Sequence, residues 1–314
     1  MVHGRFRHAG RVGGVIDIPG GLIESQYEFA GEAGRAFIAG LPARVEEFVE
    51  RWGLTVDGPP MHGMAALVLP VVRAADGVPA VVKFQVLDEE TDGEPVALRH
   101  WDGDGAVRLL DHDDATGTML LERLDAGRML SVVADSRKAV LVIAELLARL
   151  TAGPAPAGLR RLSDIAARML ADVPDALPRI ADPAQRRTVA DCAAAVREVV
   201  GEAGDRLLHW DLHFENVLAP RADSGREPWL AIDPKPLAGD PGFDLWPALD
   251  NRFEPDEVVW RFDAMTDVLG LDRDRARAWT LGRVLQNALW DVEDGRPLSP
   301  DGMEIARRLA RPKA

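Results

Sequence analysis

The sequence has almost no cysteine, few aromatic residues and no long apolar run. Cys192 is the single cysteine among 314 residues, so no disulfide can form within the chain, as is usual for cytoplasmic proteins. No apolar run approaches the roughly 20 residues of a transmembrane helix, and the first residues lack the charged segment and long apolar core of a signal peptide. We therefore expect a cytoplasmic protein that makes no membrane contact.

Basic residues are also scarce relative to acidic ones. Lys and Arg total 37 against 51 Asp and Glu, which gives a formal net charge of −14. This balance disfavours nucleic acid as a partner, because phosphate backbones are bound by basic surfaces. An acidic surface attracts cationic small molecules, although solubility alone also explains it. The length is sufficient for two lobes and a sizeable core.

One polar segment between two apolar runs carries the residues of a reaction site. It reads His209-Trp210-Asp211-Leu212-His213-Phe214-Glu215-Asn216, and a later apolar run ends in Asp233. The spacing H-x-D-x-x-x-x-N is that of the protein-kinase catalytic loop, in which Asp accepts the hydroxyl proton and Asn holds a metal ion. Mg²⁺ prefers oxygen ligands and takes few carboxylates besides substrate phosphates. The pattern predicts phosphoryl transfer from ATP, with Asp211 as the base and Asn216 and Asp233 as Mg²⁺ ligands.

An upstream hairpin supplies the expected nucleotide-binding residues. Residues 65–73 and 79–86 are rich in β-forming residues and are separated by a turn. Lys83 on the second strand corresponds to the kinase lysine that binds the α- and β-phosphates. We expect Glu94 to be its partner, with Glu89 and Glu90 as competitors. Gly63 lies where kinases place a loop over the ATP phosphates, although an ordinary turn explains it equally well.

The remaining pattern predicts an α+β chain with an α-rich second half. Strands at 107–110 and 119–122 are expected to complete a five-stranded antiparallel sheet, and residues 1–20 are expected to form a mobile arm. Apolar residues recur at helical spacing in the following segments: 24–39, 41–53, 136–151, 161–173, 183–200, 243–250, 255–269, 273–292 and 301–310.

Several segments resemble the aminoglycoside phosphotransferases. The similarity lies in four runs: Leu208-His209-Trp210-Asp211-Leu212-His213, Glu227-Pro228-Trp229-Leu230-Ala231-Ile232-Asp233-Pro234, residues 240–250 (Asp240-Pro241-Gly242-Phe243-Asp244 onward) and Gly34-Arg35-Ala36-Phe37-Ile38-Ala39-Gly40-Leu41-Pro42. Together they are most similar to the streptomycin 6-phosphotransferase group, which includes hydroxyurea phosphotransferase-like sequences.

The resemblance implies a two-lobed, protein-kinase-like α+β fold. It implies a small N-terminal lobe with an antiparallel sheet at 1–123 and an α-rich C-terminal lobe at 124–314 that holds the catalytic loop. Residues 122–125 would join the lobes, with the main chain of Glu122 and Leu124 binding adenine. It further implies that Asp244 accepts hydrogen bonds from the loop backbone.

The acceptor is expected to be a small cationic antibiotic, with streptomycin at its 6-hydroxyl as first choice. Candidate binding residues are Asp250, Glu254, Asp291 and Trp290, because carboxylates pair with guanidinium groups through two hydrogen bonds. Solvated surface acids and a core tryptophan explain the same residues as well.

Three alternatives remain. The first is a kinase for another small molecule such as hydroxyurea, and the second is a nucleotide-binding protein without catalysis. The third is a metal hydrolase, because His209, Asp211 and His213 spell H-x-D-x-H. Zinc normally requires three or four mainly His or Cys ligands, and seven His with one Cys offer few.

Overall fold

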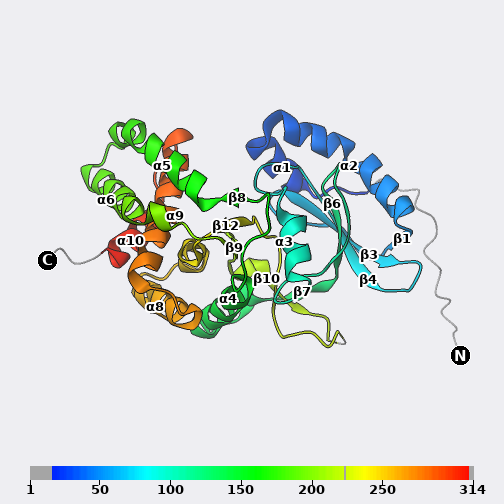
Figure 1. The fold of residues 1–314 in the computed structure, drawn as a ribbon. Coiled ribbons are helices and arrows are strands. Elements are labelled where there is room, and N and C mark those ends of the chain that lie inside the picture. Colours follow the sequence, from blue (N-terminus) through cyan, green and yellow to red (C-terminus); the bar gives the residue numbers. More distant parts are fainter. Residues whose placement is uncertain (1–15, 223, 311–314) are drawn as a thin grey trace, which may run out of the picture. The chain divides into compact units, whose positions relative to one another are not determined.

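The computed structural model describes residues 16–222 and 224–310, and it divides them into two compact units (Figure 1). One unit comprises the described chain up to Leu87 together with Leu110–Arg123. The other comprises Asp88–Leu109 and the chain from Leu124 onward. Residues 88–109, which we predicted in the N-terminal lobe, therefore cluster with the second unit. The expected arm lies mostly outside the described residues.

The first unit is an antiparallel sheet covered by two helices. The sheet has the order β1-β3-β4-β6-β5, with β2 paired to β3 on the same sheet. The elements are α1 (Gly20–Phe29), α2 (Gly31–Arg51), β1 (Leu54–Val56), β2 (Met61–His62), β3 (Ala66–Arg73), β4 (Pro79–Gln85), β5 (Leu109–Asp113) and β6 (Thr118–Glu122). The predicted hairpin is β3–β4, and the short β2 is additional to the five strands we expected.

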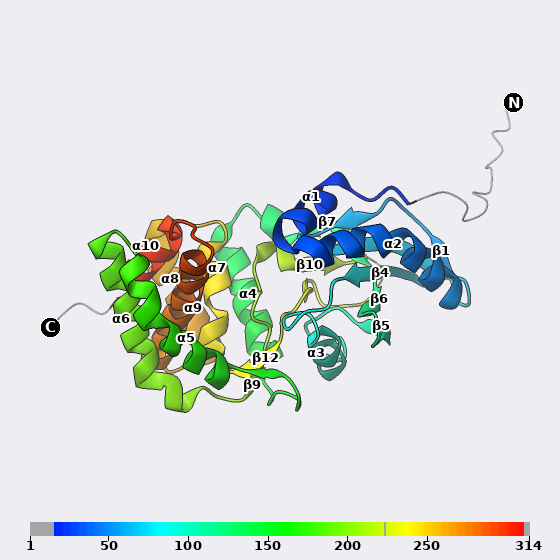
Figure 2. The same ribbon diagram turned by 90° about the horizontal axis from the view of Figure 1, so that it is seen from above.

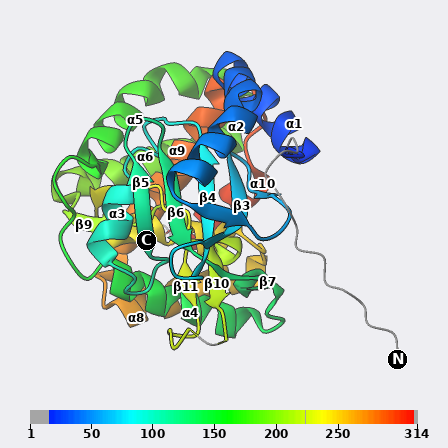
Figure 3. The same cartoon turned by 90° about the vertical axis from the view of Figure 1, so that its right-hand side faces the viewer.

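Successive side chains of each strand point to opposite faces of this sheet, and this alternation determines the face on which Lys83 lies. Val82 and Phe84 on β4 belong to one apolar cluster with Phe48 of α2, and Figure 3 shows α2 lying along the sheet. Because successive side chains of a strand point to opposite faces, Lys83 lies on the face away from α2. It pairs in register with Val68 of β3 and Met119 of β6.

The boundary between the first two helices differs from our prediction. We expected a break near residue 40, whereas the helices separate at Ala30 and Gly31, where Gly31 adopts a φ of +54°. Pro42 lies inside α2 instead of near a helix start. A proline within a helix removes one backbone hydrogen bond. Burial of α2 side chains from Phe37 to Val49 against the sheet offsets this loss.

The second unit is α-rich and carries two small three-stranded sheets. Its sheets have the orders β11-β10-β7 and β8-β12-β9. The strands are β7 (Leu124–Met129), β8 (Arg160–Arg161), β9 (Arg206–Leu208), β10 (Val217–Pro220), β11 (Leu230–Ala231) and β12 (Leu237–Gly239). The helices are α3 (Glu94–Trp101), α4 (Ser136–Leu150), α5 (Leu162–Ala176), α6 (Pro183–Val199), α7 (Trp246–Asp250), α8 (Val258–Leu269), α9 (Arg273–Glu293) and α10 (Pro300–Leu309).

Helix α9 is the centre of the second unit. It packs against α5, α6, α8 and α10 (Figure 2), and most of its residues from Ala276 to Val292 are buried. Asp272 caps its first turn by accepting a hydrogen bond from the Arg275 N–H, 2.8 Å long. Within the described residues, no helix is both long and apolar enough to span a bilayer.

Candidate active site

The predicted catalytic loop joins two strands of different sheets in the second unit. It follows β9, passes through a 3₁₀ turn at Phe214–Asn216 and enters β10. Two backbone hydrogen bonds tie it to the segment that carries Asp233: the Ile232 N–H donates to the Asn216 carbonyl (2.9 Å), and the Lys235 N–H donates to the His209 carbonyl (3.0 Å). The structure thus brings Asp211, Asn216 and Asp233 into one region.

His209 is a fully buried, neutral brace of this loop. Its Nε2 lies 3.0 Å from the Ile232 carbonyl, which requires the proton on Nε2, and its Nδ1 accepts the Asp211 N–H at 3.3 Å. The ring also stacks on Trp101, with centroids 6.1 Å apart. Burial, opposed by the Asp233 carboxylate, lowers the pKa of His209 to about 3. The ring therefore holds the loop in place, and proton transfer falls to another group.

Asp244 supports the loop from a second side. One carboxylate oxygen accepts the His209 N–H at 2.8 Å and the other accepts the Trp210 N–H, as the family resemblance implied. Trp210 has a φ of +68°, a left-handed conformation that is unfavourable for a bulky side chain. Burial raises the pKa of Asp244 to about 7, against the effect of the two N–H groups. The carboxylate holds a strained backbone immediately before Asp211.

Asp211 projects a partly exposed carboxylate from this braced backbone. Its side chain is 33% exposed, and one oxygen lies 4.0 Å from Nε2 of His213. Asn216 donates from Nδ2 to the Asp211 carbonyl at 2.9 Å, which leaves its side-chain oxygen available as an acceptor. His213 pairs with Glu215 through Nδ1 at 3.0 Å. The loop thus presents one accessible carboxylate beside one carboxamide oxygen.

Asp233 carries the other carboxylate expected at a magnesium site. It adopts a φ of +57°, and its Oδ2 lies 3.0 Å from Nζ of Lys235. Burial lowers the pKa of Lys235, but attraction to Asp233, Glu94 and Asp211 outweighs burial, so the pKa is raised. The Asp233 carboxylate and the Asn216 carboxamide oxygen are hard donors that fit Mg²⁺. Across the described residues, no three His, Cys, Asp or Glu side chains are grouped as ligands of one ion.

The nucleotide residues predicted from the sequence lie in both units. Lys83 is buried on β4, and Gly63 is exposed in the tight turn between β2 and β3. Glu94 is buried at the first position of α3, and Pro95 follows it in the first turn. Glu122 ends β6, and Leu124 begins β7. Their roles in nucleotide binding stay predictions.

The four predicted acceptor residues differ in their surroundings. Trp290 is 37% exposed and packs edge-on against Trp210 of the catalytic loop. Burial, with a smaller effect from Asp301, raises the pKa of Asp250 to about 6. Glu254 is exposed. The Asp291 carboxylate already accepts hydrogen bonds from Arg296 and from the Ser299 N–H, so its availability to a ligand is reduced.

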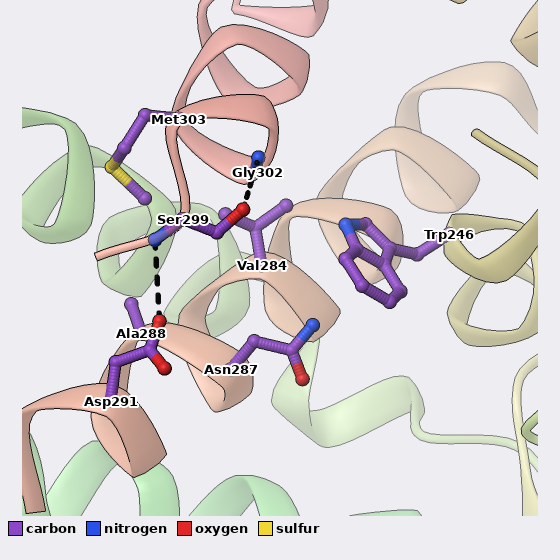
Figure 4. Close-up of a pocket in the computed structure, with 8 residues that line it drawn as sticks. All are labelled: Trp246, Val284, Asn287, Ala288, Asp291, Ser299, Gly302 and Met303. Carbon is purple, nitrogen blue, oxygen red and sulfur yellow. Dashed lines mark hydrogen bonds between the residues drawn. The ribbon is translucent and has the colours of Figure 1, made fainter. Parts of the chain in front are cut away.

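A shallow pocket lies beside Asp291, between α9, α7 and α10. Figure 4 shows the Trp246 indole facing Val284 and Asn287, with Ser299 linking Asp291 to Gly302 through two hydrogen bonds. The pocket is partly open to solvent and encloses little space. Its lining is mainly apolar, so it is a recess between packed helices and not a charged acceptor site.

Three basic residues near the loop were missed in the sequence. Lys235 follows Asp233 by two positions and was recognisable from that proximity alone. Arg160 and Arg283 each place their guanidinium carbon 4.4 Å from the Trp210 ring centroid. Arg283 lies within the long helix α9 and Arg160 in the short strand β8, and no motif in the sequence marked either residue.

Comparison with known proteins shows similarity along most of the chain. Residues 51–295 match the family model described as aminoglycoside/hydroxyurea antibiotic resistance kinase. The hydroxyurea phosphotransferase of Kitasatospora aureofaciens is 64% identical over 93% of this chain and 85% of its own length. The streptomycin 6-kinase of Streptomyces glaucescens is 56% identical over 94% of this chain and 97% of its own length.

A solved structure shows the same fold at low sequence identity. The ternary complex of a thermostable aminoglycoside phosphotransferase mutant with ADP and hygromycin B superposes with a TM-score of 0.55. It is 16% identical, and the match covers 84% of this chain and 95% of that one. The predicted protein-kinase-like fold is confirmed.

Proposed function

The chain belongs to the aminoglycoside/hydroxyurea antibiotic resistance kinases, and on this premise we propose that it transfers the γ-phosphoryl group of ATP to a small antibiotic. Streptomycin at its 6-hydroxyl is the first candidate, in line with the streptomycin 6-kinase that is 56% identical. The observation that carries the proposal is the accessible Asp211 carboxylate on a loop that His209 and Asp244 hold rigid.

Asp211 acts as the base in this proposal. The acceptor hydroxyl oxygen forms a bond to the γ-phosphorus while the bond to the β-phosphate bridging oxygen breaks, and the hydroxyl proton passes to the Asp211 carboxylate. Neutral His209 does not compete for this proton, because its Nε2 proton is directed at the Ile232 carbonyl and its Nδ1 already accepts a hydrogen bond. Orientation of the carboxylate is the main contribution of the loop.

The remaining roles follow the kinase pattern. Asn216 and Asp233 would hold Mg²⁺, which neutralises phosphate charge when bound. Lys83 is proposed to bind the α- and β-phosphates, with Glu94 as its positioning carboxylate. Gly63 and the main chain of Glu122 and Leu124 are proposed as further nucleotide contacts. A non-catalytic nucleotide-binding role is disfavoured, because all of Lys83, Asp211, Asn216 and Asp233 are present.

Hydroxyurea is the second candidate acceptor. The relative named hydroxyurea phosphotransferase is 64% identical to this chain, a higher identity than that of the streptomycin kinase. Hydroxyurea also offers a hydroxyl oxygen, so the role of Asp211 is unchanged. The two acceptors differ in charge: streptomycin carries guanidinium groups that Asp250, Glu254, Asp291 and Trp290 are proposed to contact, whereas hydroxyurea is neutral.

Replacing Asp211 tests the mechanism. Asp211→Ala is expected to reduce phosphate transfer at least 1,000-fold, on the order of the loss of a positioned base, while calorimetry still detects ATP binding. Glu215→Gln is the matched control, because Glu215 lies on the same loop and its carboxylate pairs with His213. Substantial turnover by Asp211→Ala would remove Asp211 from the mechanism.

A further inference from the structure

Trp210 occupies an unusual place in the catalytic loop. It directly precedes Asp211, its ring is almost fully buried, and its backbone is in the left-handed region with φ +68°. This conformation is unfavourable for a large residue and must be stabilised by its surroundings. The Asp244 carboxylate, which accepts the Trp210 N–H, is one such contact. What holds the Trp210 ring therefore also determines the orientation of the next residue.

Two guanidinium groups lie over that ring. The Cζ atoms of Arg160 and Arg283 are each 4.4 Å from the ring centroid, well within the range of cation–π attraction. Arg160 is partly exposed and donates from Nη2 to the Lys235 carbonyl at 3.3 Å. Arg283 is buried on α9. The more deeply buried guanidinium makes the stronger contact, because it is shielded from water.

Arg283 is held mainly by aromatic rings. Besides Trp210, its Cζ lies 5.7 Å from the Trp290 centroid and 5.8 Å from those of Trp246 and Phe243. Its Nη1 donates to Gln286 at 2.8 Å, whereas its Nε finds no hydrogen-bond acceptor among the described residues. Phe243 and Trp246 flank Asp244 in sequence. Arg283 thus contacts the catalytic loop and also the segment whose carboxylate supports that loop.

A second buried arginine shows what a purely structural role looks like. Arg261 on α8 is 1% exposed, and all three of its guanidinium nitrogens donate hydrogen bonds, to the Glu257 carboxylate and to the carbonyls of residues 248, 251 and 252. Arg283 lacks such a set of acceptors. The carboxylates that act electrostatically on its guanidinium are those of Asp211, Glu90 and Asp244.

We propose that Arg283 is a positioning residue for phosphoryl transfer, acting through the Trp210 ring to hold Asp211 toward the acceptor hydroxyl. The inference rests on the proposed kinase function for its catalytic consequence. Its structural consequence, an ordered backbone at residues 209–211, does not depend on which acceptor is used. A loop that moves by about 1 Å loses on the order of 100-fold in rate.

The test compares Arg283→Met and Arg283→Lys with Arg277→Met. Arg277 lies on the same helix, and its side chain pairs with exposed Asp274, so it serves as the control. With streptomycin and hydroxyurea as acceptors, Arg283→Met should lower kcat roughly 100-fold while each KM stays within about threefold. Arg283→Lys keeps the positive charge, and its kcat should be about tenfold higher than that of Arg283→Met. Unchanged kcat in Arg283→Met would overturn the inference.

A double-mutant cycle separates positioning from general stability. If Arg283 acts through Trp210, then Arg283→Met should change kcat less than about threefold in a Trp210→Leu background, because the stack is already lost. Equal effects in both backgrounds would contradict the proposed route. If Arg283 only stabilised the fold, Arg283→Met would lower the unfolding temperature, and its effect on kcat would be the same with Trp210 as with Leu at position 210.

Hydrogen exchange gives a readout that needs no turnover. The His209 and Trp210 amides are bonded to Asp244 and should exchange about tenfold faster in Arg283→Met than in wild type or Arg277→Met, on the order expected for a locally loosened segment. Equal exchange would overturn the inference. If the wild type transfers no phosphate to either acceptor, the proposed function is contradicted. The exchange rates alone then decide whether Arg283 orders the loop backbone.

Discussion

His209 shows how one buried side chain links the active site to stability. An ordinary histidine has a pKa near 6.5, whereas burial lowers that of His209 to about 3. Between these values the unfolded chain takes up a proton that the folded protein does not. The contribution of His209 to stability is therefore fully present above about pH 6.5 and is lost as the pH falls.

We predict that this loss disappears when His209 is replaced. At pH 5 the wild type has lost about 2 kcal/mol of unfolding free energy through His209. The difference in unfolding free energy between wild type and His209→Asn should therefore shrink by about that amount from pH 7 to pH 5. Urea unfolding at both pH values measures it. Exposed His100 provides the control through His100→Asn, and a difference independent of pH would contradict the account of His209.

Asp250 gives a prediction that distinguishes charged from neutral acceptors. Burial first, and Asp301 second, raise the pKa of Asp250 to about 6. The carboxyl is therefore mostly neutral at pH 5 and mostly ionised at pH 7. If it pairs with a guanidinium of streptomycin, affinity should rise roughly tenfold over this interval.

Calorimetry at the two pH values tests this role, with hydroxyurea as the neutral control ligand. Asp250→Asn should bind streptomycin with little dependence on pH, and hydroxyurea affinity should change little in either protein. A streptomycin affinity that rises equally in wild type and Asp250→Asn would remove Asp250 from the acceptor site.

At the scale of elements, the approach of α9 to the Asp240–Asp244 turn is the contact that places Asp244. Thr280 of α9 donates from its hydroxyl to the Gly242 carbonyl at 2.9 Å. A Cβ at Gly242 would lie 2.6 Å from the Ala276 Cα and 3.0 Å from its carbonyl oxygen. Only glycine allows the two backbones to approach this closely.

Gly242→Ala is therefore expected to push α9 away from the turn. We predict a loss of about 1–3 kcal/mol in unfolding free energy, as for other overpacked sites, together with a lower kcat because Asp244 moves. Gly201→Ala is the matched control, since nothing lies within 4 Å of a Cβ there. Equal stability of the two variants, measured by thermal unfolding, would show that the approach is not constraining.

The parts of the fold that were predicted have local signals. The β3–β4 hairpin and α4 follow directly from β-branched runs, a turn and apolar spacing. The break between α1 and α2 was misplaced because Pro42 is typical of a helix start, whereas burial of α2 keeps the helix continuous through it. The grouping of residues 88–109 with the second unit has no local signal, because their packing partners, such as Leu150 for the Trp101 indole N–H, are distant in sequence.

The candidate site divides in the same way. Asp211 and Asn216 were singled out because their spacing matches the kinase loop, and Asp233 because it ends the next apolar run. Arg160 and Arg283 reach Trp210 from segments 50 and more residues away, and only the fold brings them together. The engagement of Asp291 with Arg296 and Ser299 likewise depends on how the chain folds back after α9, which the sequence pattern alone does not specify.

At the scale of the whole molecule, Asp211, Asn216 and Asp233 belong to the second unit and Lys83 to the first. The acidic charge of −14 is consistent with attraction of a cationic acceptor, and it would act as well through solubility. The family description names both aminoglycosides and hydroxyurea. Which acceptor is used is therefore the property that most needs direct measurement.

The most direct measurement is the mass and linkage of the product formed with ATP and Mg²⁺. Streptomycin and hydroxyurea would be supplied separately and then together, and the products identified by mass spectrometry and phosphorus NMR. The account predicts one added phosphoryl group, on the 6-hydroxyl of streptomycin as the preferred acceptor, and none with Asp211→Ala. Exclusive phosphorylation of hydroxyurea would transfer the assignment to the second candidate, and bound ATP with neither product would contradict the proposed function.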